Sequence, residues 1–69
     1  MTFEALCKLP NGTPVRLLND RVGRMAVWHK GERAVGVLMP GDGLLLTVPC
    51  DALDLLPDGT VVQIAKVSN

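Results

Sequence analysis

The sequence predicts a small, mostly β domain, a barrel or sandwich of five short strands preceded by one short helix. Three observations predict this fold class. The apolar runs are short, turn residues separate them at close spacing, and no long helical pattern occurs. With 69 residues, the chain has less than half of the roughly 150 residues typical of one domain. We therefore expect a single domain over residues 1–69.

Residues 1–10 carry a short helical pattern. Phe3, Leu6 and Cys7 are spaced i, i+3, i+4 to lie on one face, and Thr2 is placed to act as the N-cap. Pro10 ends the pattern, so we expect a helix of about two turns. A helix this short is marginal on its own and must pack against the rest of the domain.

Strand-like segments occupy the rest of the chain. Gly23 lies near the start of the second strand, where we expect a bulge or a sharp bend. A one-turn 3-10 helix is expected over residues 49–53, before the last strand. The predicted strands span residues 14–18, 22–29, 33–39, 44–48 and 60–67.

Four short motifs follow one another along residues 12–67. They are Gly12-Thr13-Pro14-Val15, Val22-Gly23-Arg24-Met25, Val35-Gly36-Val37 and Val48-Pro49-Cys50-Asp51-Ala52-Leu53. This order resembles that of the SH3-like barrels, and most closely that of the KOW-type and related small barrels. The resemblance implies a five-stranded SH3-like barrel over residues 12–67, and KOW-type relatives would imply RNA or DNA as a partner.

Catalysis is not expected. The type II dihydrofolate reductases, enzymes of similar architecture, carry Val-Gln-Ile-Tyr before the same Pro, whereas this chain has Leu45-Leu46-Thr47-Val48. His29, the single histidine, has no Ser, Cys or Lys at a spacing typical of a nucleophile and its base, and we expect it to face solvent at a strand end. No glycine pattern matches a phosphate-binding loop. We therefore expect a non-catalytic protein without a cofactor.

The two cysteines, Cys7 and Cys50, are too few for a disulfide framework. We expect reduced, mostly buried thiols that pack as small apolar groups. No Cys-x-x-Cys or His-x-x-x-His spacing supports a metal site. The sequence shows neither a secretory signal nor an apolar run of the ~18 residues that a membrane span needs. The expected location is the cytoplasm, with no membrane partner.

The apolar content exceeds what a domain of this size can bury. Hydrophobic residues make up 48% of the chain, with eleven Leu and nine Val. A domain this small buries only about 60% of its unfolded surface. Contiguous exposed apolar surface usually marks an interaction site, which predicts self-association or a protein partner. The best candidates for this apolar interface are Leu18, Leu38 and Leu45.

Charge is balanced overall but unevenly distributed. Residues 1–33 hold six basic and three acidic residues, and residues 34–69 hold one basic and four acidic residues. The two parts therefore carry charges of +3 and −3. Opposite charges favour pairing between copies, although such steering affects association rate and register more than affinity.

Alternation along residues 22–29 defines a candidate binding face. If Met25 and Val27 face the core, then Arg24, Ala26 and Trp28 lie on the opposite face, continued by Lys30. A tryptophan flanked by cations can stack on a base or on a partner side chain. The candidate binding residues are Arg24, Trp28 and Lys30, supported by Arg16 and Arg33.

This face has three interpretations. Trp28 could stack on bases while Arg24 and Lys30 contact phosphates, or the same residues could anchor a protein contact. Alternatively, the N-terminal helix could cover Trp28 through Phe3 and Leu6. Zero net charge gives little counterion-release drive, so any nucleic-acid binding would be weak. The sequence thus favours a protein-interaction module, a homo-oligomer or an accessory subunit of a larger assembly, with a KOW-like RNA- or DNA-binding barrel as the alternative.

Overall fold

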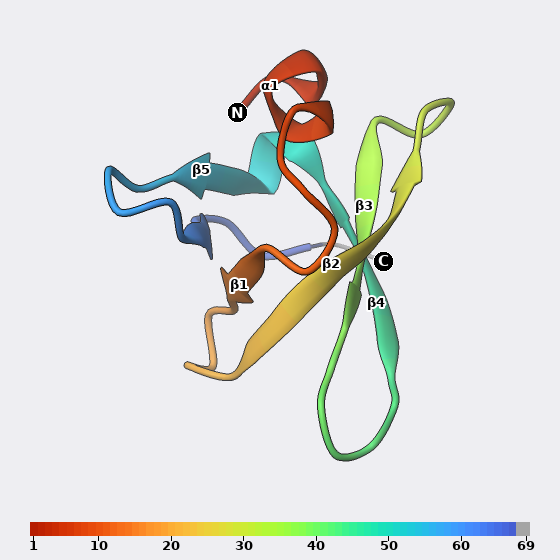
Figure 1. Cartoon of the computed structure of the whole chain (residues 1–69), viewed down its shortest axis with the longest axis vertical. Helices are drawn as coiled ribbons and strands as arrows, with labels where there is room; N and C mark the ends of the chain where they lie inside the picture. Colours follow the sequence, from red (N-terminus) through yellow and green to blue (C-terminus); the bar gives the residue numbers. More distant parts are fainter. Residues whose placement is uncertain (68–69) are drawn as a thin grey trace.

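The computed structural model describes residues 1–67 and shows a mostly β protein (Figure 1). Six strands form one mixed sheet in the order β4-β3-β2-β1-β6-β5, in which β1 and β6 are parallel and the other neighbours are antiparallel. The elements are α1 (Phe3–Cys7), β1 (Pro14–Arg16), β2 (Val22–His29), β3 (Ala34–Leu38), β4 (Leu45–Pro49), the 3-10 turn η1 (Cys50–Ala52), β5 (Leu53–Leu55) and β6 (Val61–Gln63).

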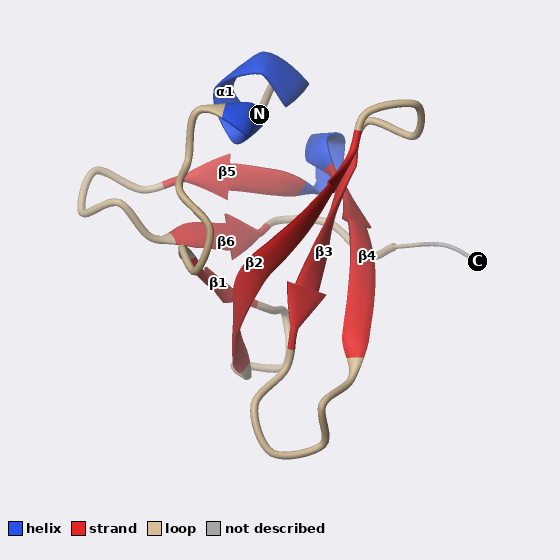
Figure 2. Cartoon of the chain, turned by 45° about the vertical axis from the view of Figure 1, so that its right-hand side comes forward, coloured by secondary structure: helices blue, strands red, loops and turns tan. Residues whose placement is uncertain are grey.

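The sheet is arranged as two groups of strands that run across each other (Figure 2). One group is β2, β3 and β4, and the other is β1, β6 and β5. The sheet is not closed in the described residues, since β4 and β5 each have a single neighbour. The prediction of a mostly β fold is confirmed, but a closed barrel is not seen.

The core lies between these two groups of strands and under α1. In β1, β2 and β4, buried and more exposed positions alternate, because one face of each strand packs on the core. The largest fully buried side chains come from α1, β1, β2, β3, β5, β6 and the segment after β3. They are Leu6, Met25, Met39, Leu53, Val15, Val35, Val37 and Val61.

The predicted N-terminal helix is confirmed, and its packing explains why so short a helix is stable. The Thr2 hydroxyl accepts a hydrogen bond from Ala5 N–H at 3.2 Å, as an N-cap does. Phe3 and Leu6 are buried. The Met1 ammonium donates to the carbonyls of residues 50 and 53, which fixes the helix beside η1 (Figure 1).

The C-terminal part differs most from the prediction, which placed one strand over residues 60–67. The structure has only the three-residue strand β6 in that range and a further short strand, β5, before it, so the sheet has six strands rather than five. β5 follows η1 directly, and β6 ends at Gln63. The Ile64 N–H donates to the Ala52 carbonyl at 2.8 Å, which continues the β5–β6 pairing by one residue beyond the strand ends. A three-residue strand has almost no periodicity of its own, so β5 forms because β6 supplies its partner.

The irregularity predicted in β2 exists, but it does not lie at Gly23. The register between β2 and β3 shifts between Met25 and Val27, which makes Ala26 the extra residue. Gly23 serves a different purpose. A Cβ at this position would lie 2.6 Å from Met39 Sδ and 2.9 Å from the Leu38 carbonyl oxygen, so only glycine allows β2 and β3 to approach so closely here.

The two cysteines differ from each other. Cys50 is buried in the core cluster, whereas Cys7 is exposed, so the prediction of mostly buried thiols is wrong for Cys7. Cys7 is the last residue of α1. The buried face of this helix is formed by Phe3 and Leu6, and Cys7 lies outside that face. Both thiols are free.

Candidate interaction surface

Trp28 faces the core rather than an exposed binding face. Its indole Nε1–H donates to the Leu6 carbonyl at 3.0 Å, and the partly buried ring packs against the core cluster. The helix that contributes Leu6 also contributes Phe3 to that cluster. Of the three interpretations derived from the sequence, the placement of Trp28 therefore matches the one in which α1 covers it.

The bulge in β2 explains why simple alternation misplaced these side chains. Arg24 lies opposite the exposed Leu38 before the bulge, and Trp28 lies opposite the fully buried Val35 after it. One extra residue between them inverts the alternation, so Arg24 and Trp28 point to opposite faces. For the same reason Val27, expected in the core, is 40% exposed.

The remaining basic candidates do not form one patch with Trp28. Arg24 Nη1 donates to the Gly12 carbonyl at 2.9 Å. Arg33 lies at the turn after β2, 6.0 Å from the centre of the Phe3 ring and 3.8 Å from the Glu4 carboxylate. Lys30 is exposed in that same turn, and Arg16 is exposed at the end of β1. The structure thus brings Lys30 and Arg33 into one turn and leaves Arg16 and Arg24 elsewhere.

The sequence predicted that His29 faces solvent, but the structure shows otherwise. It is partly buried at the end of β2, and its Nε2 atom is a buried nitrogen without a hydrogen-bond partner in the described part of the chain. This atom lies 3.5 Å from where a Cβ would stand on Gly36.

The three leucines predicted for the apolar interface are all about half exposed. Leu18, Leu38 and Leu45 are exposed by 52%, 46% and 46%. Leu38 and Leu45 face each other across β3 and β4. Leu18 and Leu45 line the same groove. We call these three residues the β4 surface, because Leu45 lies on β4, Leu38 lies opposite it on β3 and Leu18 lies across the groove beside β4.

Val27 extends this apolar area, and sequence reasoning missed it. A Cβ on Gly36 would lie 3.3 Å from both Val27 Cβ and Leu45 Cδ1, so these two side chains converge over the glycine from the strands on either side. Val22 lines a second hollow of about 540 Å³ together with Leu38. The missed signal was the bulge, which periodicity alone does not locate.

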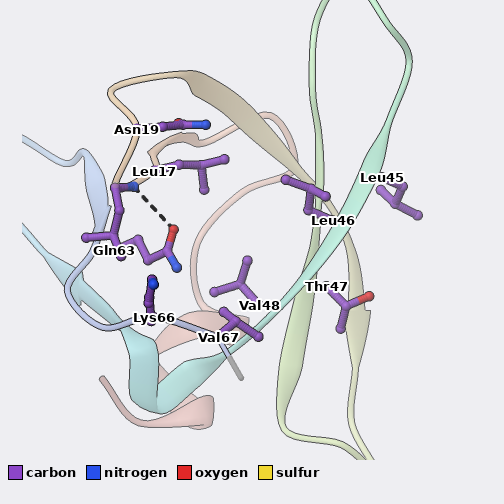
Figure 3. A pocket seen from close by; sticks show the side chains of 10 residues that line it. Leu17, Asn19, Leu45, Leu46, Thr47, Val48, Gln63, Lys66 and Val67 are labelled. Atoms are coloured by element: carbon purple, nitrogen blue, oxygen red, sulfur yellow. Dashed lines mark hydrogen bonds between the residues drawn. The ribbon is translucent and has the colours of Figure 1, made fainter. Parts of the chain in front are cut away.

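A groove of about 560 Å³ lies beside β4 (Figure 3). Four consecutive strand residues, 45–48, line it, and no residue of β3 does. Leu46 and Val48 lie on the groove side of β4, whereas the Leu45 and Thr47 side chains point to its other side (Figure 3). Because β3 pairs along one edge of β4, this groove follows the unpaired edge. The opposite wall contains Leu18, whose N–H donates to Gln63 Oε1 at 3.3 Å, and the C-terminal residues Lys66 and Val67.

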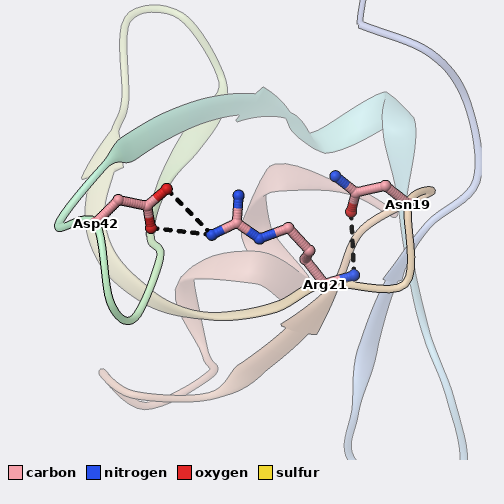
Figure 4. Close-up of polar contacts among 3 residues, drawn as sticks. All are labelled: Asn19, Arg21 and Asp42. Carbon is pink, nitrogen blue, oxygen red and sulfur yellow. Dashed lines mark hydrogen bonds and ion pairs between the residues drawn. The ribbon is translucent and has the colours of Figure 1, made fainter.

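An exposed ion pair joins the loops at one end of the sheet (Figure 4). Arg21 Nη2 lies 2.9 Å from Asp42 Oδ1 and 3.2 Å from Asp42 Oδ2. The hydrogen bond from Arg21 lowers the pKa of the Asp42 carboxyl below its ordinary value. Exposed pairs of this kind contribute little to stability, so the pair aligns the two loops more than it holds the fold.

Asp58 accepts a hydrogen bond from Thr60 N–H at 2.9 Å. This bond lowers the pKa of the Asp58 carboxyl and fixes the turn between β5 and β6. Asp51 does not cap η1 with its side chain: the N-cap position is taken by Pro49, and no side-chain hydrogen bond caps the turn.

Comparisons of the chain with protein-family models, curated proteins and solved structures find no match. No group of three or more His, Cys, Asp or Glu side chains that could hold a metal ion occurs among residues 1–67. Over the same residues, no helix has the length and apolar character to cross a membrane.

Proposed function

We propose that this protein is a non-catalytic interaction module that associates with a second copy of itself through the β4 surface. The observation that carries the proposal is the exposure of Leu18, Leu38 and Leu45 on and beside β4. Isolated surface leucines need no explanation, but apolar side chains that adjoin across a strand pair and a groove are typical of an interface.

Charge supports a second copy as the occupant. No charged residue occurs between Gly43 and Pro49, so two identical β4 segments do not repel each other. The chain as a whole is neutral, with oppositely charged halves, which lets copies approach without net repulsion. An acidic or basic partner would have no complementary charge to meet on β4 itself.

We also propose that the domain is related to the SH3-like barrels, with its seam open between β4 and the C-terminal segment. Two crossing groups of strands and a 3-10 turn directly after Pro49 support this relation. An open seam leaves a strand edge and a groove at the surface, both of which suit a binding role.

Leu45→Lys is expected to weaken self-association at least about tenfold, because a charge replaces an exposed apolar side chain within the interface. Sedimentation velocity over a concentration series measures the change. The matched control is Leu55→Lys, since Leu55 is 42% exposed on the opposite edge strand β5. Equal association of the two variants and the unmodified protein would exclude the β4 surface as the interface.

A further inference from the structure

The hydrogen bonds between β3 and β4 show which backbone groups of β4 are free. Met39 N–H donates to the Leu44 carbonyl and Cys50 N–H to the Arg33 carbonyl. In an antiparallel ladder these bonded pairs recur at every second residue, so residues 46 and 48 also bond to β3. The N–H and C=O groups of Leu45 and Thr47 therefore face the other edge, where no strand lies among the described residues.

The two edges of the sheet differ in how they are protected. Edge strands of natural proteins are usually short or carry charges that discourage pairing. β5 is only three residues long and has the exposed Asp54 at its centre. β4 has five residues and no charge, and its one protective feature is Pro49 at its end, which lacks an N–H. β4 is thus the edge on which a further strand can form.

The groove of about 560 Å³ along residues 45–48 leaves space for that strand. We propose that two copies of this chain pair through their β4 strands, antiparallel and edge to edge, so that the sheet continues from one copy into the other. This inference rests on the proposed function and adds to it the geometry of the contact. The partner strand would lie along the open edge of β4, beside the groove.

Full overlap of the two five-residue strands places the twofold axis at Thr47. Thr47 then pairs with Thr47 of the second copy, and Leu45 pairs with Pro49 of the second copy. Each copy supplies two donors, the N–H groups of Leu45 and Thr47, so the pair forms four hydrogen bonds between the copies. The Pro49 carbonyl accepts from Leu45 of the second copy, but Pro49 has no N–H, so the Leu45 carbonyl of each copy has no donor in this register.

Amide hydrogen exchange of the unmodified protein tests this geometry residue by residue. The amides of Leu46 and Val48 bond to β3 and are expected to be protected at every concentration. The amides of Leu45 and Thr47 are expected to exchange freely in dilute protein. When nine in ten chains are paired, these two amides should exchange about tenfold more slowly, since only unpaired chains expose them.

A backbone substitution gives the second test. Thr47→Pro removes an edge-facing N–H without touching the β3 ladder, and each dimer loses two of its four hydrogen bonds. We expect dimerisation at least about tenfold weaker by sedimentation velocity. Thr47→Val is the matched control, because it keeps both the N–H and the branched side chain, and it should pair like the unmodified protein.

The outcomes separate this inference from the proposed function. A dimer whose Leu45 and Thr47 amides stay unprotected overturns the edge pairing and leaves self-association intact. A chain that remains monomeric at all concentrations overturns both. If Thr47→Pro does not fold, the exchange pattern of the unmodified protein decides the question alone.

Discussion

Leu53→Ala is expected to lower the free energy of unfolding by about 2–5 kcal/mol. Leu53 has no exposed surface and lies where η1 meets β5, within the single core cluster. Truncation removes buried methyl groups and leaves a cavity that the surrounding strands fill only partly. Urea unfolding followed by far-ultraviolet circular dichroism measures the loss.

Leu55→Ala is the control for this substitution, since Leu55 belongs to the same three-residue strand but is 42% exposed. Its expected cost is about 0.5 kcal/mol or less. Both variants must be compared at one protein concentration, because self-association raises apparent stability. Equal losses in the two variants would show that β5 does not fix Leu53 in the core as described.

Gly23→Ala is expected to cost about 1–3 kcal/mol of unfolding free energy, through overpacking rather than through a cavity. The added methyl would lie 2.6 Å from both Met39 Sδ and Val37 Cγ1, and 2.9 Å from the Leu38 carbonyl oxygen. The flexible Met39 side chain can move, but the backbone carbonyl of β3 can do so only if the strands separate. The unfolding midpoint in urea is the measurement.

Gly31→Ala provides the comparison for that result. A Cβ on Gly31 meets nothing within 4 Å, so only the backbone preference of the turn changes. We expect this variant to unfold within about 0.5 kcal/mol of the unmodified protein. A tolerated Gly23→Ala would mean that β2 and β3 do not approach as closely as the structure shows.

Much of the fold follows from the sequence because local signals agree with each other. β2 spans residues 22–29 as predicted, since its apolar run is bounded by clear turn residues on both sides. The helix follows from its N-cap and its two buried residues. β5 could not be predicted in the same way, because it depends on a partner, β6, that is itself only three residues long.

The candidate site was harder to predict, and the reason is one inserted residue. Periodicity assumes an uninterrupted ladder, whereas the extra residue Ala26 inverts the faces of β2 beyond it. This moved Trp28 inward and Val27 outward. The prediction of exposed leucines did not depend on the register of β2. The ratio of apolar residues to available core predicts that some apolar side chains remain exposed, and no bulge alters that ratio.

The molecular mass of the unmodified chain, measured by sedimentation equilibrium from low to high micromolar concentration, tests the central claim most directly. If the β4 surface binds a second copy, the mass should rise with concentration towards twice that of the 69-residue chain. A mass that stays at one chain throughout this range would contradict the account, since the apolar side chains around β4 would then have no copy to cover them.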